Sequence, residues 1–296
     1  MYPAPFVCSM PIFTEAERRH NAKVRRIDVA VHFFVISAMA VLCGRENHFV
    51  HLQQEIEATG ISRLAVSFVL FAVSVTSWGF LIFTTEDKKT FNSYKLKDTV
   101  GHFCFLTHIV FSLIVAQATL DFVSKFALYQ GLGHIPIFGQ TQLFLYRTGL
   151  LVHSTGVIVT ILFMKMCWYD EVWQRETRMA EKENPLILVV QLYGHWIPAF
   201  NCFFDLLLNK DPKLILLYGV SFTETCIAFT VFAVFFQSWM ELLHYITKAY
   251  PYPFLRSMDT LFKRIMFVLV VLVFAFCIFS VLQGMVWVAA MFEASP

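Results

Sequence analysis

The chain has 296 residues, of which 57% are apolar or aromatic and only 15% are charged, and its mean hydropathy is +0.62. Soluble domains usually carry about 25% charged residues, so this composition excludes an ordinary soluble globular domain, and it excludes a disordered chain as well. The formal net charge is +2, without a basic stripe or a nucleic-acid-binding motif, so nucleic acid is not expected as a partner. The seven cysteines are scattered and form no C-x-x-C motif, which argues against a disulfide framework or a zinc ribbon. The sequence predicts an all-α polytopic transmembrane helix bundle.

Seven stretches are long and apolar enough to cross a membrane, which takes about 20 apolar residues per helix. The first stretch is short and carries Asp28 and His32 near its start. We therefore expect six core spans and one extra N-terminal span. In chain order the predicted spans are 27–43, 64–83, 100–120, 144–168, 186–208, 214–240 and 265–288.

The orientation is predicted from Lys and Arg, which collect in the cytoplasmic loops of membrane proteins. With a cytoplasmic N-terminus, 17 of the 23 Lys and Arg lie on the inner side and six on the outer side. Seven spans then place the C-terminus outside. The outer six are Arg45, Arg63, Lys125, Arg147, Lys210 and Lys213.

The third and fifth predicted spans each carry a polar stripe. Hydroxyl and ionisable side chains are costly in hydrocarbon, so they tend to face the bundle interior and to mark functional sites. The alternative is that they are hydrogen-bonding contacts between helices, worth roughly 0.6 to 2 kcal/mol each, and this is the default for Thr223, Thr230, Gln237 and His244 in the sixth span. The stripes comprise Cys104, Thr107, His108, Ser112 and Thr119 in the third span, and Gln191, His195, Pro198, Cys202 and Asp205 in the fifth.

Thr107 and His195 are expected at nearly the same depth. Counted from the cytoplasmic ends of their spans, they lie roughly 10 to 14 Å deep at 1.5 Å per residue. A threonine hydroxyl is a nucleophile only when a base lies about 2.6 to 3.2 Å away, and His195 could be that base. Asp205 follows His195 by ten residues on the same helix, about 15 Å away, so it cannot complete a triad. A third group from another helix stays open, with His244, Gln237 and Tyr193 as candidates.

Several short motifs resemble those of the family that contains androgen-induced protein and androgen-dependent TFPI-regulating protein. The resemblance covers roughly residues 64–288, and the motifs stand at corresponding span ends. They are Phe105-Leu106-Thr107, Thr119-Leu120-Asp121, Trp168-Tyr169-Asp170, His195 with Asp205 ten positions later, His244, Thr247, and Tyr252-Pro253-Phe254-Leu255.

The resemblance implies a multi-pass membrane hydrolase that cleaves fatty acid esters of hydroxy fatty acids. Carried over residue by residue, it makes Thr107 the nucleophile and His195 the base. It also implies that residues 64–296 form the six-span core and residues 1–63 a basic cytoplasmic N-terminus with the extra span. The chain departs from the family pattern at Leu192 and Trp196, where relatives resemble His and Thr.

The expected activity is therefore that of a threonine-type carboxylic ester hydrolase acting on a lipid ester within the membrane, with no cofactor or metal. The expected location is the endoplasmic reticulum or the plasma membrane, and the expected partners are the lipid substrate and membrane lipids. Backbone amides of a broken helix near Gly194 and Pro198, or the side chain of Asn201, are candidate oxyanion donors. Ser112, Ser154 and Cys104 are alternative nucleophiles.

Two other functional classes stay open at this point. A haem protein could use two of His102, His108, His153, His195 and His244 as ligands, although the first two differ by six positions and would point to different sides of one helix. The other class is a seven-span transporter or receptor without catalytic activity.

Overall fold

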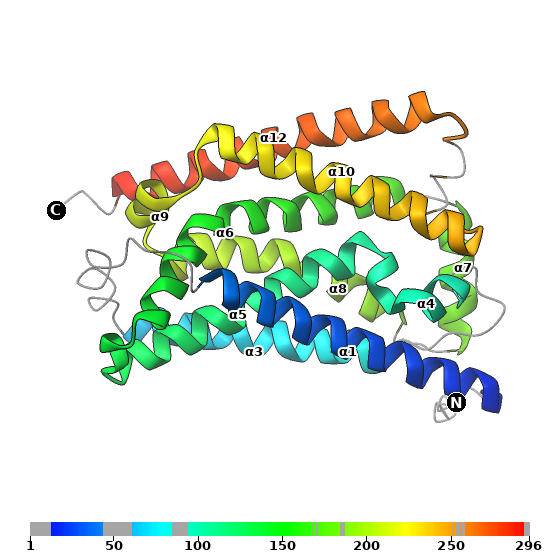
Figure 1. The fold of residues 1–296 in the computed structure, drawn as a ribbon, viewed down its shortest axis with the longest axis horizontal. Helices are drawn as coiled ribbons and strands as arrows, with labels where there is room; N and C mark the ends of the chain where they lie inside the picture. The colour runs from blue at the N-terminus through cyan, green and yellow to red at the C-terminus, as the bar shows by residue number, and fades with distance from the viewer. Residues whose placement is uncertain are drawn as a thin grey trace, which may run out of the picture.

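The computed structural model describes residues 13–43, 61–84, 94–167, 169, 171–183, 187–250, 252, 255 and 258–292. Within these ranges all regular secondary structure is helical, and most helices run along the long axis of the molecule (Figure 1). The predicted all-α polytopic bundle is confirmed. The elements are α1 (Glu15–Cys43), α3 (Ile61–Thr84), α4 (Tyr94–Val100), η1 (Gly101–Cys104), α5 (Leu106–Tyr129), η2 (Leu132–His134), α6 (Pro136–Leu162), η3 (Phe163–Cys167), α7 (Glu171–Glu183), α8 (Ile187–Phe204), η4 (Asp205–Asn209), α9 (Pro212–Tyr218), α10 (Phe222–Thr247) and α12 (Leu261–Phe292).

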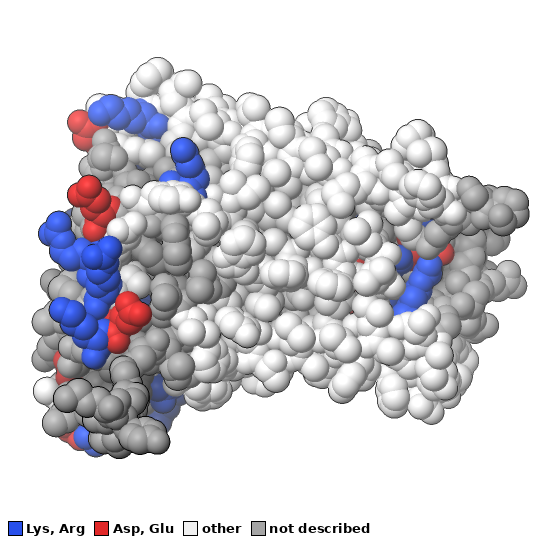
Figure 2. Space-filling view, turned by 180° about the vertical axis from the view of Figure 1, so that it is seen from behind, with Lys and Arg blue, Asp and Glu red and all other residues white. Residues whose placement is uncertain are grey.

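Five of the described helices are long and apolar enough to cross a membrane, namely α3, α5, α6, α10 and α12. Helix α1 covers the predicted span 27–43, and α8 with the following turn η4 corresponds to 186–208; their crossing of the membrane stays a prediction. In Figure 1 helix α1 begins at one end of the bundle and α12 finishes at the other, as an odd number of crossings requires. The face seen in Figure 2 has a broad zone without charged side chains between its two ends, which suits a hydrocarbon environment.

The third predicted span, 100–120, is wrong at its start. Gly101 has a φ of +63°, a left-handed conformation that favours glycine, and Phe105 is extended with φ −104° and ψ 134°. These two residues interrupt the chain, so that α4 and the 3₁₀ turn η1 precede α5, which begins only at Leu106. Thr107 is therefore the second residue of a helix rather than a residue seven positions into one.

The sixth predicted span, 214–240, is two helices. The short helix α9 ends before Gly219, and α10 then starts at Phe222 with a capping box in which Ser221 and Glu224 bond each other's backbone N–H groups. The pattern Ser221-Phe222-Thr223-Glu224 is a sequence signal for this break. The helices at 27–43, 64–83, 144–168 and 265–288 are longer than predicted, and at 186–208 the α-helix ends at Phe204 and continues as the π-helical turn η4.

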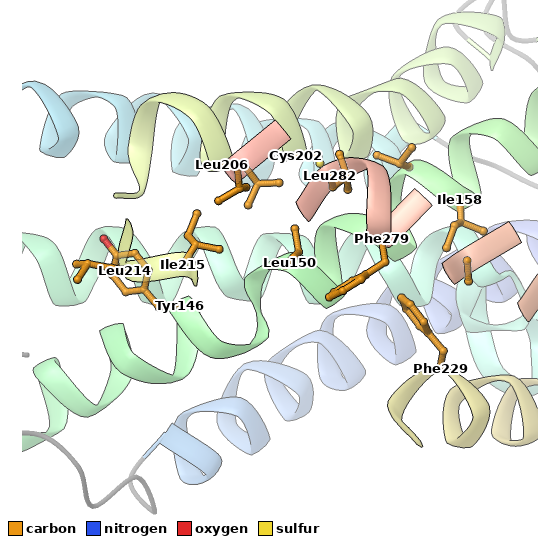
Figure 3. Packing of buried hydrophobic residues seen from close by; sticks show 13 residues of the cluster. Tyr146, Leu150, Ile158, Cys202, Leu206, Leu214, Ile215, Phe229, Phe279 and Leu282 are labelled. Atoms are coloured by element: carbon orange, nitrogen blue, oxygen red, sulfur yellow. The ribbon is translucent and has the colours of Figure 1, made fainter. Parts of the chain in front are cut away.

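The main apolar core joins α6, α8, α9, α10 and α12. In Figure 3, Leu150 of α6, Cys202 of α8, Leu206 of η4 and Phe279 of α12 belong to this one cluster. Phe279 packs edge to face against Phe229 of α10, with ring centroids 6.1 Å apart. A close approach of α6 and α8 lies beside the core, because a Cβ at Gly156 would stand 3.2 Å from the Cβ of Pro198.

Helix α1 packs against α4, η1, α5 and α6. At its amino-terminal half, Lys23 and His20 contact the carboxylate of Asp98 on α4 at 3.0 and 3.3 Å. Partial burial opposes ionisation of Asp98, but the hydrogen bonds from Lys23 and His20 outweigh it and hold the pKa of this carboxyl below its ordinary value. Deeper in the bundle, Asp28 contacts His102.

Candidate active site

Thr107 and His195 meet inside the bundle. Thr107 lies in the first turn of α5 and His195 near the middle of α8, and both side chains are buried, with 7% and 9% of their surface exposed. The distance from Thr107 Oγ1 to His195 Nε2 is 3.0 Å, which is a hydrogen-bonding distance. The similar predicted depths allowed this contact, and the catalytic roles of the two residues stay predictions.

The imidazole of His195 is held from α6 and the segment that follows it. The ring of Phe163 stacks on the imidazole at a centroid distance of 3.4 Å and an angle of 17°. The hydroxyl of Thr160 donates to the backbone carbonyl of His195. Phe163 opens the π-helical turn η3, a helix distortion that is frequent at functional sites. Neither support was visible in the sequence, because each depends on how α6 and α8 pack.

A cavity of about 110 Å³ lies beside the pair. It is enclosed by residues of α5, α6 and α8 on one side and of α10 and α12 on the other, and most of its lining is Leu, Val, Ile and Phe. The polar side chains among the lining residues are Thr107, Thr155, His195, Gln237 and Tyr252.

Tyr252 brings the segment after α10 to the start of α5. Its hydroxyl accepts a hydrogen bond of 2.7 Å from the backbone N–H of Leu106, the residue before Thr107. Phe105 packs against the same phenol ring, with centroids 5.9 Å apart. Tyr252 belongs to a motif that carried the family resemblance, but the sequence alone gave it no role at the site.

The other polar residues of the two stripes, and the alternative nucleophiles, lie apart from the Thr107–His195 hydrogen bond where the structure describes them. Thr119 donates to the carbonyl of Val115, four residues earlier in α5, so its hydroxyl bonds back to its own helix. Ser112 is buried in the same helix. Ser154, an alternative nucleophile, donates to the carbonyl of Leu150. The side chains of Cys104 and Gln191, and all of Trp168 and Asp170, lie outside the described residues.

The candidate third groups are engaged elsewhere. Gln237 donates to Glu241 at 2.7 Å, the ring of His244 stacks on Tyr250 with centroids 3.9 Å apart, and Tyr193 is half exposed beside Phe80. None of these contacts orients His195.

The two suggested sources of an oxyanion hole on α8 are not supported. The helix is continuous from Ile187 to Phe204 despite Pro198, so the predicted break near Gly194 is wrong. The amide of Asn201 donates to Ser74 Oγ at 2.7 Å, and its donor is therefore used in packing α8 against α3.

Asp205 of η4 belongs to a second buried cluster, whose member Asp121 lies on α5 about 21 Å beyond Thr107 at 1.5 Å per residue. Its carboxylate accepts a hydrogen bond of 2.6 Å from His153 Nε2, so the exclusion of a triad with His195 agrees with the structure. Asp121 is paired with Lys125 at 3.0 Å and with Lys210 at 3.1 Å. Both lysines were counted as outer-loop residues, which is wrong, because both are buried within the bundle.

His102 and His108 do not point to different sides of one helix, so this prediction is also wrong. The prediction holds only for one continuous helix, whereas His102 lies in η1 and His108 in α5. The extended residue Phe105 turns the chain between them, and the two rings stack with centroids 4.6 Å apart. Among the described residues no group of three or more His, Cys, Asp or Glu side chains is placed to hold a metal ion.

The fold and this site define a polytopic helical membrane protein with a buried hydroxyl–imidazole pair beside an apolar cavity. The chain matches the family model described as FAR-17a/AIG1-like protein over residues 66–285. It belongs to the FAR-17a/AIG1-like family, which is the androgen-induced protein family that the motifs indicated. No curated protein and no solved structure gives a significant match to the chain.

Proposed function

We propose that this protein is an integral membrane ester hydrolase in which Thr107 is the nucleophile and His195 the general base. The observation that carries the proposal is the 3.0 Å contact between Thr107 Oγ1 and His195 Nε2 at the wall of an apolar cavity. A hydroxyl is a weak nucleophile at neutral pH, and an imidazole at this distance can remove its proton as it attacks.

The proposed reaction has two halves. His195 Nε2 takes the proton of Thr107 while Oγ1 attacks the ester carbonyl, and the tetrahedral intermediate collapses as the protonated imidazole gives that proton to the departing alcohol. The acyl group is then esterified to Thr107. In the second half His195 activates a water molecule, which attacks the acyl-enzyme and releases the fatty acid, and Thr107 recovers its proton.

The developing oxyanion requires hydrogen-bond donors, which commonly supply about 3 to 4 kcal/mol. The amino end of α5 favours negative charge, because the N–H groups of a first helical turn have no carbonyl partner within the helix. Thr107 itself lies in that turn. We assign the side-chain donor to Tyr252, whose hydroxyl lies at the same helix end and lines the same cavity.

The substrate class follows from the lining of the cavity. Apolar side chains surround the hydroxyl–imidazole pair, so the acyl chain of a lipid ester would gain about 0.8 kcal/mol for each methylene that it buries. Within this class we propose fatty acid esters of hydroxy fatty acids, the substrates that the family resemblance implies. No step of the proposed reaction requires a cofactor.

We also propose that the Thr107 end of the bundle faces the cytoplasm. Charged side chains gather at the end where α4 and α7 lie (Figures 1 and 2), and Arg175, Arg178 and Lys182 of α7 are exposed there. Anchoring in the endoplasmic reticulum or the plasma membrane, with residues 1–63 as an extension of a core at 64–296, is part of the same proposal.

The test is labelling of the purified protein with a fluorophosphonate probe, together with turnover of a fatty acid ester of a hydroxy fatty acid. Thr107→Ala and His195→Ala should each abolish both signals. The matched control is Thr119→Ala, because Thr119 is a partly buried hydroxyl of the same helix that donates to a carbonyl, and it should behave as wild type. Full activity in Thr107→Ala would disprove the nucleophile assignment.

A further inference from the structure

A buried carboxylate of α1 binds the turn that precedes Thr107 through two hydrogen bonds. Asp28 is only 1% exposed. Its Oδ1 accepts the backbone N–H of His102 at 2.8 Å, and its Oδ2 accepts Nδ1–H of the same residue at 2.6 Å. Both carboxylate oxygens therefore bind one residue of η1, through its main chain and its side chain at once.

The turn is shaped to admit this carboxylate. Gly101 has a φ of +63°, and a Cβ built at this position would stand 2.2 Å from Asp28 Oδ1. The carboxylate thus occupies the space that a side chain at position 101 would need. Only glycine permits both the left-handed backbone and the close approach.

The contact continues from the turn to the first turn of α5. The imidazole of His102 stacks on the ring of His108, with centroids 4.6 Å apart, and His108 directly follows Thr107. The N-cap residue of α5, Phe105, makes no capping hydrogen bond through its side chain. The start of this helix is therefore held by Asp28 through His102 on one side and by Tyr252 on the other.

We propose that Asp28 is a positioning residue for the Thr107 nucleophile. Asp28 lies in α1, before the region 66–285 that matches the family model, so the N-terminal extension would support the active site of this protein directly. This role depends on the proposed function, because it concerns the nucleophile of that reaction. Asp28 touches neither the cavity nor the reacting atoms in the contacts described, and it acts through His102 and the helix start.

The experiment compares Asp28→Asn and Asp28→Ala with wild type, each normalised to the amount of folded protein. A nucleophile displaced by a fraction of an ångström to 1 Å loses roughly 10- to 100-fold in rate. We expect kcat and the rate of fluorophosphonate labelling to fall by that factor in Asp28→Ala, with a smaller fall in Asp28→Asn, which keeps one acceptor oxygen. KM should stay near the wild-type value, because the cavity is untouched.

Asp98→Asn is the matched control, since it removes another contact of α1 with the same region, the one to Lys23 and His20. It should leave kcat and labelling unchanged. A second readout needs no activity: amide hydrogen exchange should accelerate in residues 101–110 of Asp28→Asn and stay unchanged in residues 187–204.

The outcomes separate the two proposals. If Thr107→Ala keeps wild-type labelling, the proposed function itself fails. If Thr107→Ala is inactive but both Asp28 variants turn over at the wild-type rate per folded molecule, only the positioning role fails. A loss of folded protein in the Asp28 variants, without a change in kcat of the folded fraction, would also overturn it, because Asp28 would then serve stability alone.

Discussion

Two of the buried histidines, His153 and His195, each have a polar partner, and the surroundings of the two pairs differ. His153 pairs with Asp205 at 2.6 Å in a cluster where each carboxylate has a lysine nearby, whereas His195 pairs with the neutral hydroxyl of Thr107 at 3.0 Å beside an apolar cavity. In the first cluster opposite charges compensate each other inside the protein. In the second pair no charge is neutralised, and there is room for another molecule.

The position of Thr107 in its helix explains part of this difference. Hydroxyls within a helix usually donate to the carbonyl four residues earlier, as Thr119, Ser154 and Thr155 do here. Thr107 is the second residue of α5, so the residue four positions earlier belongs to η1 rather than to its own helix. Its hydroxyl is directed to an imidazole of another helix instead. In a membrane bundle, a hydroxyl that does not bond to its own helix and that lines a cavity is thus a candidate for a catalytic role.

The two largest expected effects are a loss of stability at the charge cluster and a loss of activity at the hydroxyl–imidazole pair. Lys210→Met leaves Asp121 without one of its two lysines, and breaking a buried ion pair costs about 3 to 5 kcal/mol, so its thermal unfolding midpoint in detergent should fall sharply. Thr107→Ala should keep the wild-type midpoint and lose ester turnover. Equal unfolding midpoints for Lys210→Met and wild type would show that the charge cluster does not stabilise the fold.

The next effect concerns Tyr252. Tyr252→Phe keeps the ring that packs against Phe105 and removes the hydroxyl. Loss of an oxyanion donor lowers kcat by about 10²- to 10³-fold, with little change in KM, and steady-state kinetics on a lipid ester would measure both. An unchanged kcat would assign the oxyanion to backbone groups alone.

A smaller effect is expected from filling the cavity. Ala233 lines it from α10, and Ala233→Phe should exclude part of the acyl chain. Displacing two methylenes costs about 1.6 kcal/mol, which raises KM for long-chain esters roughly tenfold.

Short-chain esters should be hydrolysed by Ala233→Phe as by wild type. Gly284→Ala is a control in α12, where an added Cβ meets no atom within 4 Å. Equal losses for short and long esters would place the acyl chain outside this cavity.

The smallest effect belongs to Asp98. Because its pKa lies below the ordinary value, its contact with Lys23 stabilises the fold above the unfolded-state pKa of about 4 and is lost as the pH falls through the lowered value. Asp98 is half exposed, so the contribution is screened and stays below about 1 kcal/mol. The unfolding midpoints of Asp98→Asn and wild type should differ slightly at pH 7 and converge in strong acid. A difference that grows on acidification would contradict this.

The sequence identified Thr107 and His195 as polar residues of two spans at a similar level, although the depth of Thr107 was counted along one helix from residue 100, whereas α5 begins only at Leu106. It did not predict the break at Gly101, since the left-handed turn is matched to a carboxylate 73 positions earlier in the chain. The sequence did not predict the burial of Lys125 and Lys210 either, because their carboxylate partner is known only from the packed structure. A single helix shows that an ionisable residue stands in an apolar run, but only the packed bundle shows which partner compensates it.

The contact of Asp28 with the turn at Gly101 also shows that the region of sequence similarity and the structural unit around the site begin at different residues. Sequence similarity to the family begins at residue 66, yet the buried carboxylate that closes on His102 is supplied 38 residues upstream. A protein trimmed to the homologous region would lack Asp28. It would have an empty space beside Gly101 and would leave the imidazole of His102 without its carboxylate partner, close to Thr107. Versions prepared for biochemistry should therefore start ahead of Glu15, and swaps of N-terminal segments between relatives should exchange the glycine turn together with the helix that fills it.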